Sequence, residues 1–262
     1  MLETLVIIGN GMVGHKFVEL MLERGADSHY RMVIFGEERR TAYDRVHLSE
    51  YFSDKSVDDL LLATPEGYRQ SGVQIFTGDR VASIDRQAKK ITSSKGVVVR
   101  YDKLVLATGS YPFVPPIPGN DAAGTFVYRT LDDLDAIRTY AANAKTGVVV
   151  GGGLLGLECA NALKLLGLET HVVEFAPRLM PVQLDELGGS MLRKKIAYSR
   201  FTAWVWDRAA LGPLKINQSL ICICCWGKLA SRALARSRSQ ASPMQWEGMN
   251  SAVWHSFFLA IA

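Results

Sequence analysis

The sequence predicts an α/β fold in which 262 residues contain two similar parallel-sheet units. Three observations support this fold class. A strand, a glycine-rich turn, a helix and a second strand follow one another over residues 4–37. The same order returns over residues 147–174, and each copy ends in an acidic residue. Both copies also open on a short apolar run, which is typical of a strand buried on both faces of a parallel sheet.

The first copy opens with the apolar strand Leu5–Ile8 and turns through residues 9–14, Gly-Asn-Gly-Met-Val-Gly. In a G-x-G-x-x-G turn each glycine has a separate role. Gly9 permits the tight bend, Gly11 lets a pyrophosphate approach the backbone, and Gly14 lets the next helix pack closely on the sheet. The free amides at the start of that helix would then face the phosphates.

The second strand of this copy covers residues 31–35, and Glu37 stands just past it. A carboxylate at this place can accept hydrogen bonds from the 2′ and 3′ hydroxyls of an adenosine ribose. A glycine-rich turn by itself is weak evidence, because such turns occur in many α/β proteins. Here the strand, helix and acid all stand where dinucleotide binding needs them, so the first copy predicts a dinucleotide site.

Composition and charge argue against several other classes of function. Hydrophobic residues make up 48% of the chain, which is enough for a packed core. No run of about 18 apolar residues occurs, so we expect no membrane span, and without a secretory leader we expect a cytoplasmic protein. Residues 198–262 hold 7 Lys and Arg against 2 Asp and Glu, whereas residues 1–197 hold 23 against 24. The basic charge belongs to residues 198–262, so we expect no nucleic-acid partner.

Residues 38–49 form a polar stretch that follows the first acid closely. They could fold over a bound cofactor with Arg45 near its phosphates. In an ordinary connecting loop, Arg45 would instead pair with Asp44 or Glu50, and the spacing leaves both interpretations open. His47 stands alone in this stretch, and we interpret it as a structural hydrogen-bonding residue.

Between the two copies, short helices precede a series of strands. Residues 57–70 predict one or two helices broken at Pro65. A buried strand then leads into the small-residue turn at residues 107–109, where the backbone can pass close to a ligand. Residues 111–119 are rich in proline and predict a stiff connector and a domain boundary. The expected strands are residues 73–76, 81–84, 90–92, 97–99 and 103–106, of which the middle three form an antiparallel meander or a set of hairpins.

The second copy follows an expected helix over residues 130–143, for which Thr130 is the candidate N-cap. Two dinucleotides, one for each copy, is the direct interpretation of the repeat. The acid that ends each copy favours an unphosphorylated ribose, and at the second site this means NADH over NADPH. The expected elements are the strand 147–150, the turn Gly151-Gly152-Gly153-Leu154-Leu155-Gly156, the helix 157–166, the strand 170–173 and the terminal acid Glu174.

After an amphipathic helix over residues 184–196 the pattern stops near Tyr198. All five tryptophans lie beyond this point, as do three of the four cysteines. Residues 198–262 are either an extension that packs on the half-domain or the product of an interrupted reading frame, and we favour the second hypothesis. We therefore expect no stable core there, and no partner strands for the second sheet after its second strand. Cys222 and Cys225 have C-x-x-C spacing, but we expect no metal or redox role for them.

Taken together, these motifs resemble the FAD- and NAD(P)-dependent pyridine nucleotide-disulfide oxidoreductase superfamily. More closely still, the sequence resembles the N-terminal part of the large subunit of NADH-dependent assimilatory nitrite reductases. The residues that carry this resemblance are 8–15, 42–49, 107–112 and 151–158. It implies two Rossmann-like domains with ββα layers: an FAD domain at residues 1–117 and an incomplete NAD domain at residues 118–197. Residues 198–262 would then be an atypical tail and no native domain.

The resemblance also implies a set of cofactor contacts, carried over position by position. FAD would be held by Gly9, Gly11, Met12, Gly14, Glu37, Arg45, Ser49, Val81, Ala107, Thr108 and Gly109. NADH would be held by Gly151, Gly153, Gly156 and Glu174, with Glu158 as a candidate catalytic residue near the nicotinamide. Glu50 stands where related reductases often have a lysine near the flavin. The redox-active cysteine pair of the disulfide reductases is absent, and we expect Cys159 to be a packing residue.

The implied reaction is hydride transfer from NADH to FAD. Electrons would then pass to an acceptor domain or protein, a siroheme and 4Fe-4S centre that reduces nitrite and whose ligands this sequence lacks. One alternative is a flavoprotein reductase that serves a ferredoxin or rubredoxin. Another is an inactive, truncated remnant that at most binds a nucleotide.

Overall fold

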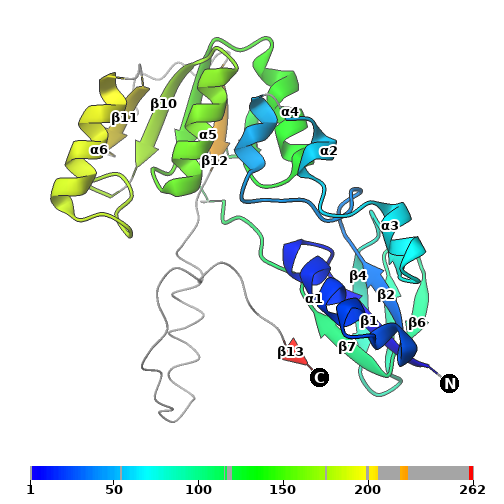
Figure 1. Cartoon of the computed structure of the whole chain (residues 1–262). Helices are drawn as coiled ribbons and strands as arrows, with labels where there is room; N and C mark the ends of the chain where they lie inside the picture. The colour runs from blue at the N-terminus through cyan, green and yellow to red at the C-terminus, as the bar shows by residue number, and fades with distance from the viewer. Residues whose placement is uncertain are drawn as a thin grey trace. The chain divides into compact units, whose positions relative to one another are not determined.

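The computed structural model describes residues 2–53, 55–114, 116, 120–174, 176–198, 201–205, 219–223 and 260–261 (Figure 1). The described residues divide into two compact units. The first contains residues 2–47 and 56–110 together with strand β13 (Ala260–Ile261). The second contains the described residues of 48–55 and those between 111 and 223. The expected boundary at residues 117 and 118 lies outside the described residues.

The first unit is built on a parallel sheet with strand order β7-β1-β2-β3, whose β7 edge pairs antiparallel with β13. Parallel strands need both faces covered, and their side chains alternate between the two. The strands are β1 (Glu3–Ile8), β2 (Tyr30–Phe35), β3 (Gln74–Phe76) and β7 (Lys103–Leu106). Because these strands run in the same direction, their carboxyl ends lie at one edge of the sheet.

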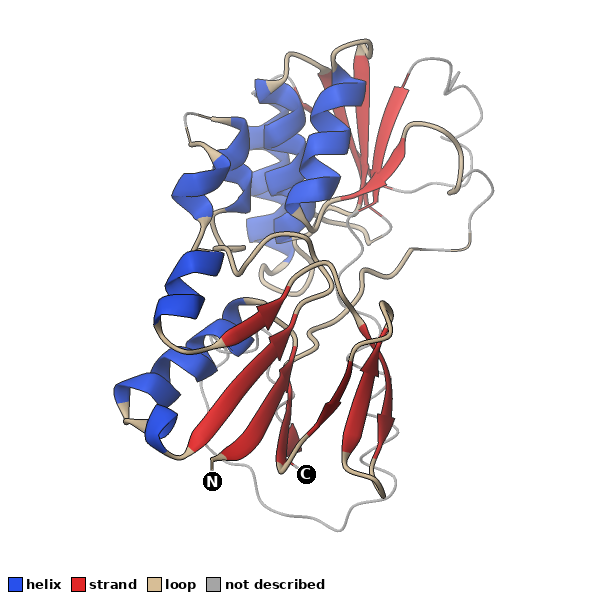
Figure 2. Ribbon diagram, turned by 90° about the vertical axis from the view of Figure 1, so that its right-hand side faces the viewer, coloured by secondary structure: helices blue, strands red, loops and turns tan. Residues whose placement is uncertain are grey.

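Two different layers cover this sheet, as the lower half of Figure 2 shows. Leu5 and Ile7 face one cluster, which they share with residues of helices α1 (Met12–Glu23) and α3 (Pro65–Gln70). Val6 and Ile8 face a second cluster, to which the small antiparallel sheet contributes. That sheet has the order β4-β5-β6 and comprises β4 (Val81–Asp85), β5 (Lys90–Ser93) and β6 (Val98–Arg100). The unit therefore has the expected ββα layers.

Two short elements complete the first unit. The 3-10 helix η1 (Ala26–Ser28) follows α1, and helix α2 (Val57–Leu60) precedes α3. The expected break at Pro65 is confirmed: Pro65 is the first residue of α3, and the hydroxyl of Thr64 accepts a hydrogen bond from the amide of Gly67 as the N-cap.

The second unit contains a sheet in the order β11-β10-β9-β12-β8, in which every pair is parallel. Its strands are β8 (Thr125–Val127), β9 (Thr146–Val150), β10 (Glu169–Glu174), β11 (Phe201–Val205) and β12 (Ser219–Ile223). Its helices are α4 (Leu131–Ala141), α5 (Leu154–Leu165) and α6 (Glu186–Tyr198), and the 3-10 helix η2 (Leu48–Phe52) packs against α5. Thr130 caps α4, as expected, in a capping box with Asp133.

The expected fold class is confirmed, but one expectation about the second sheet is wrong. We expected no partner strands after β10, whereas β11 pairs with β10 and β12 lies between β9 and β8. An open sheet edge presents unpaired amides and carbonyls, which a short run with high β propensity can satisfy from anywhere in the chain. Residues 201–205 and 219–223 are such runs. That residues 198–262 form no stable core stays a prediction.

Candidate functional site

The first glycine turn brings β1, α1 and β7 together at the carboxyl edge of the sheet. Gly9 has φ +111°, and a Cβ there would lie 2.1 Å from the carbonyl oxygen of Ala107. A Cβ on Gly14 would lie 2.0 Å from the carbonyl oxygen of Gly9. These separations are far below van der Waals contact, so both positions require glycine. The turn thus has the tight bend and the close helix packing that the motif predicts.

Gly11 serves a different purpose in the same turn. Its φ is −84°, and no described atom lies within 4 Å of a Cβ built on it. It is also the N-cap of α1, where no side chain among the described residues caps the helix. The first amides of α1 therefore lack side-chain acceptors, and their partial positive charge can bind an anion. The space beside Gly11 suits the approach of a phosphate group.

The remaining candidates of the first site occupy neighbouring positions on this edge. Met12 is the half-buried first residue of α1, and Glu37 is exposed two residues past β2. Thr108 and Gly109 are exposed just past β7, where Gly109 has φ +66°. Val81 begins β4 and packs against the core beneath the sheet. Ser49 differs from these residues, because it lies in η2 and so belongs to the second unit.

Arg45 pairs with neither of the partners that the spacing offered. Its guanidinium forms an ion pair with Glu38, and it lies 5.0 Å from the centre of the Tyr43 ring. The hydroxyl of Tyr43 donates to the other oxygen of Glu38 over 2.6 Å. This cluster of three side chains orders the loop that follows β2. Whether Arg45 also reaches a cofactor phosphate stays a prediction.

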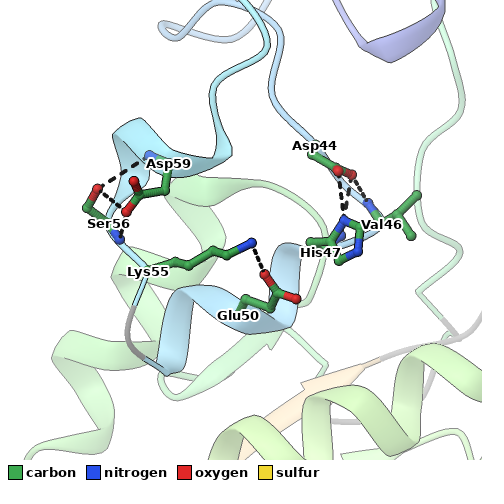
Figure 3. Close-up of polar contacts among 7 residues, drawn as sticks. All are labelled: Asp44, Val46, His47, Glu50, Lys55, Ser56 and Asp59. Atoms are coloured by element: carbon green, nitrogen blue, oxygen red, sulfur yellow. Dashed lines mark hydrogen bonds and ion pairs between the residues drawn. The ribbon is translucent and has the colours of Figure 1, made fainter.

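Asp44 and Glu50 have other partners (Figure 3). Asp44 accepts the amide of Val46 over 2.8 Å, and its carboxylate lies 2.7 Å from Nδ1 of His47. Burial raises the pKa of Asp44, but the hydrogen bonds from His47 and Val46 outweigh it and lower that pKa. His47 thus makes a structural contact of the expected kind. Glu50 forms an ion pair with Lys55 within the second unit.

The sequence did not predict a chain of hydrogen bonds that starts at Asn10 in the first turn. The hydroxyl of Tyr68 on α3 donates to Oδ1 of Asn10 over 3.0 Å, and Nδ1 of His15 on α1 lies 2.8 Å from the Tyr68 oxygen. Because the Tyr68 proton is directed to Asn10, Nδ1 of His15 must carry a proton of its own. Burial lowers the pKa of His15, while Glu19 raises it and Lys16 lowers it. The chain ties the turn to α1 and α3.

The burial that lowers the pKa of His15 predicts that the stability of the chain depends on pH. The pKa of folded His15 lies below about 6.5, its usual value, so between the two pKa values the unfolded state binds more protons. We therefore expect the free energy of unfolding to rise with pH across this window, and to rise less in His15→Asn. Urea unfolding from about pH 5 to pH 7 measures both slopes. His29→Asn, at an exposed position, is the control, and equal slopes for His15→Asn and wild type would contradict the prediction.

The second glycine turn repeats the geometry of the first. Gly151 has φ +116°, and a Cβ on Gly156 would lie 1.7 Å from the carbonyl oxygen of Gly151. Gly153 is the N-cap of α5, again without a side-chain cap among the described residues, and no described atom lies within 4 Å of a Cβ built on it. Gly151, Gly153 and Gly156 thus correspond in geometry to Gly9, Gly11 and Gly14.

The acid of the second copy is tied more closely to its turn. Glu174 is the last residue of β10, and its Oε2 accepts the amide of Gly152 over 2.6 Å. Its Oε1 accepts the amide of Ala176 over 2.7 Å. Each carboxylate oxygen has two lone pairs, so Glu174 can still accept ribose hydroxyls while it braces the turn.

The remaining candidates are two neighbouring residues of α5 and the pair Cys222 and Cys225. Glu158 is half-buried on α5, and Cys159 beside it is 0% exposed, as a packing residue would be. Within the part of the chain that the structure describes, no three His, Cys, Asp or Glu residues gather closely enough to hold a metal ion. The side chains of Cys222 and Cys225 lie outside the described residues. No described helix is both long enough and apolar enough to span a membrane.

Two glycine turns of one geometry, each between a parallel strand and an uncapped helix, define a protein with two dinucleotide-binding folds. Residues 3–198 match the sequence model of the pyridine nucleotide-disulphide oxidoreductase family. The chain belongs to this family.

Two nitrite reductase large subunits are similar to this chain in sequence. Over 193 residues, or 74% of this chain, the sequence is 58% identical to the NAD(P)H nitrite reductase large subunit of Klebsiella oxytoca. Over 192 residues, or 73% of this chain, it is 55% identical to the NADH nitrite reductase large subunit of Escherichia coli (strain K12). The alignments cover 20% and 23% of these two relatives. The chain therefore corresponds to a small part of either protein.

Solved structures share the fold. The NADH:rubredoxin oxidoreductase of Clostridium acetobutylicum superposes with a TM-score of 0.76 at 25% identity, over 86% of this chain and 58% of that one. The ferredoxin reductase for the CYP199A2 system of Rhodopseudomonas palustris gives a TM-score of 0.75, also at 25% identity, over 92% and 63% of the two chains.

Proposed function

We propose that this chain is an NADH-dependent flavoprotein reductase module of the nitrite reductase large-subunit type. The observation that carries the proposal is the pair of glycine turns, which offer two uncapped helix N-termini and two terminal acids in one chain. FAD would bind the first turn and NADH the second. The 58% and 55% identities to nitrite reductase large subunits support this assignment of the module.

At the first turn, the backbone supplies most of the binding. The amides at the start of α1 would hold the pyrophosphate of FAD, with Gly11 leaving room for it. Glu37 would accept the ribose hydroxyls, and Ala107, Thr108 and Gly109 would line the approach from β7. Gly9 and Gly14 would contribute to FAD binding by fixing the turn through close backbone contact. When bound, the flavin supplies the hydride acceptor that no side chain provides.

At the second turn, the amides of α5 would hold the pyrophosphate of NADH and Glu174 its adenosine ribose. A 2′-phosphate would meet the Glu174 carboxylate, so like-charge repulsion favours NADH over NADPH. Glu158 lies on α5, about one turn from its start, and we assign it a place near the nicotinamide. The contribution of these residues is binding and orientation of the nicotinamide.

We further propose that the electrons leave through a separate acceptor, a siroheme and 4Fe-4S centre that reduces nitrite in the cytoplasm. The likeness to rubredoxin and ferredoxin reductases favours a second candidate, in which a small electron-transfer protein is the acceptor. Sequence identity to these two structures is 25%, against 58% for the Klebsiella relative. The nitrite-reducing acceptor is therefore the first choice.

The visible spectrum of the full chain tests the proposed module. We expect the purified chain to take up FAD, and anaerobic addition of NADH to bleach the flavin absorbance. NADPH at the same concentration should bleach it more slowly. A chain that cannot be loaded with FAD, or a loaded chain whose spectrum NADH leaves unchanged, would contradict the proposal.

A further inference from the structure

The motif places Glu37 at the first site, but it does not say what holds that side chain in position. Glu37 follows β2 in a loop whose backbone is fixed on both sides. The amide of Gly36 donates to Phe76 O over 2.8 Å, and the amide of Gly78 donates to Glu38 O over 2.7 Å. The amide of Asp79 donates to Gly36 O over 2.9 Å. The end of β3 and the turn after it therefore hold the residues on both sides of Glu37 by backbone hydrogen bonds.

This turn is held in its own place by the side chain of Asp79. The side chain is 2% exposed, and Oδ2 accepts the hydroxyl of Ser93 over 2.8 Å. Its Oδ1 accepts the hydroxyl of Ser94 and the amide of Lys95, both over 3.1 Å. Asp79 therefore connects the loop of Glu37 to the hairpin between β5 and β6.

The charge of Asp79 suits this connecting role. Burial raises the pKa of Asp79, but the hydrogen bonds from Ser93, Ser94 and the Lys95 amide outweigh it and hold the pKa below its usual range. The carboxylate is thus ionised at neutral pH and accepts all three hydrogen bonds as an anion. Charge-assisted hydrogen bonds are about twice as strong as neutral ones, so the connection is rigid.

The same residue also fixes the second candidate for adenosine contact. Val81 follows Asp79 by two residues, and it pairs with Ser93 across the β4 and β5 ladder, just before a bulge. Ser93 in turn donates to Asp79. The candidate residues for ribose, Glu37, and for adenine, Val81, are therefore both attached to one buried carboxylate.

We propose that Asp79 is a positioning residue for the adenosine end of the first dinucleotide site, which sets Glu37 for its contact with the ribose hydroxyls. This inference rests on the proposed function, because it takes the first turn as a dinucleotide site. Asp79 acts through Glu37 and touches no ligand itself. A site residue needs such support, since a small displacement of a hydrogen-bonding group forfeits its contact.

The test compares ADP with 2′,3′-dideoxy-ADP as probes of the FAD-free full chain. All variants carry Gly156→Ala, because a methyl group 1.7 Å from the Gly151 carbonyl oxygen displaces α5 and removes the second turn as a competing ADP site. With the first site unchanged, this chain should bind ADP about tenfold more tightly, because only ADP offers hydroxyls to Glu37, and tenfold corresponds to about 1.4 kcal/mol. Asp79→Asn should remove most of this preference, and Ser94→Ala should reduce it. Asp27→Asn, an exposed substitution on η1, should leave it unchanged. A preference ratio does not depend on the fraction of chain that is folded.

A double-mutant cycle shows whether Asp79 acts through Glu37. In a Glu37→Gln background the preference is already lost, so Asp79→Asn should cause no further loss. An unchanged preference in Asp79→Asn, or in Ser94→Ala if Asp79→Asn does not fold, would overturn the inference. A wild-type chain that binds neither nucleotide would instead overturn the proposed function.

Discussion

Replacing Gly9 with alanine is expected to destabilise the first unit by about 4 kcal/mol and to abolish the uptake of FAD. Two costs add at this position. The backbone at φ +111° is unfavourable for any residue with a side chain, and the new methyl group would lie 2.1 Å from the Ala107 carbonyl oxygen. Neither β1 nor β7 can move without breaking the sheet. Urea unfolding and the flavin content of the purified chain measure the two effects.

Two alanine variants separate the causes of this loss. Gly25 also has positive φ, +69°, but open space around it, so Gly25→Ala should cost about 1 kcal/mol and leave FAD uptake intact. Gly11→Ala should leave stability nearly unchanged and weaken FAD binding, because its methyl group enters the space assigned to the pyrophosphate. Normal stability and FAD uptake in Gly9→Ala would show that the turn has been misplaced.

Replacing Gly156 with alanine is expected to slow reduction by NADH severely while FAD stays bound. A methyl group on Gly156 would lie 1.7 Å from the carbonyl oxygen of Gly151, so α5 must move away from the second turn. The amides assigned to the pyrophosphate of NADH would move with the helix. We expect the rate of anaerobic flavin reduction by NADH to fall at least about a hundredfold, which corresponds to about 2.7 kcal/mol. Stopped-flow absorbance measures this rate.

A chemical reductant provides the control for this prediction. Dithionite reduces flavin without a nicotinamide site, so it should bleach Gly156→Ala and wild type alike. Gly153 has open space around it, so Gly153→Ala should keep α5 in place. The loss of NADH binding free energy in this variant should exceed the loss of free energy of unfolding. Reduction of Gly156→Ala by NADH at the wild-type rate would assign NADH to a different part of the chain.

Local features of the fold could be predicted from the sequence. Gly9 and Gly14 contact groups within a few residues or at the adjoining strand end, and a motif records such constraints in full. The prediction of where α5 starts was less accurate: we expected residue 157, whereas the helix begins at Leu154. Gly153 is both the last glycine before the helix and its N-cap, so the turn and the helix overlap in sequence.

Contacts across long stretches of chain could not be predicted. Asp79 and Tyr68 reach partners 14 and 58 residues away, and no spacing rule connects them. Arg45 pairs with Glu38, although two other acids are nearer to it in the sequence, because the course of the loop determines which charged side chains come into contact. Strand β12 lies between β9 and β8, although β9 ends about 70 residues before it begins. Such pairings depend on which sheet edges remain open after the local units form.

A crystal structure of the full chain soaked with FAD and NADH tests the central claim most directly. We expect the pyrophosphate of FAD at the start of α1 beside Gly11, and that of NADH at the start of α5 beside Gly153. The adenosine riboses should contact Glu37 and Glu174. Density for either ligand elsewhere, or side chains in place of both phosphates, would contradict the claim that two glycine turns hold the two cofactors.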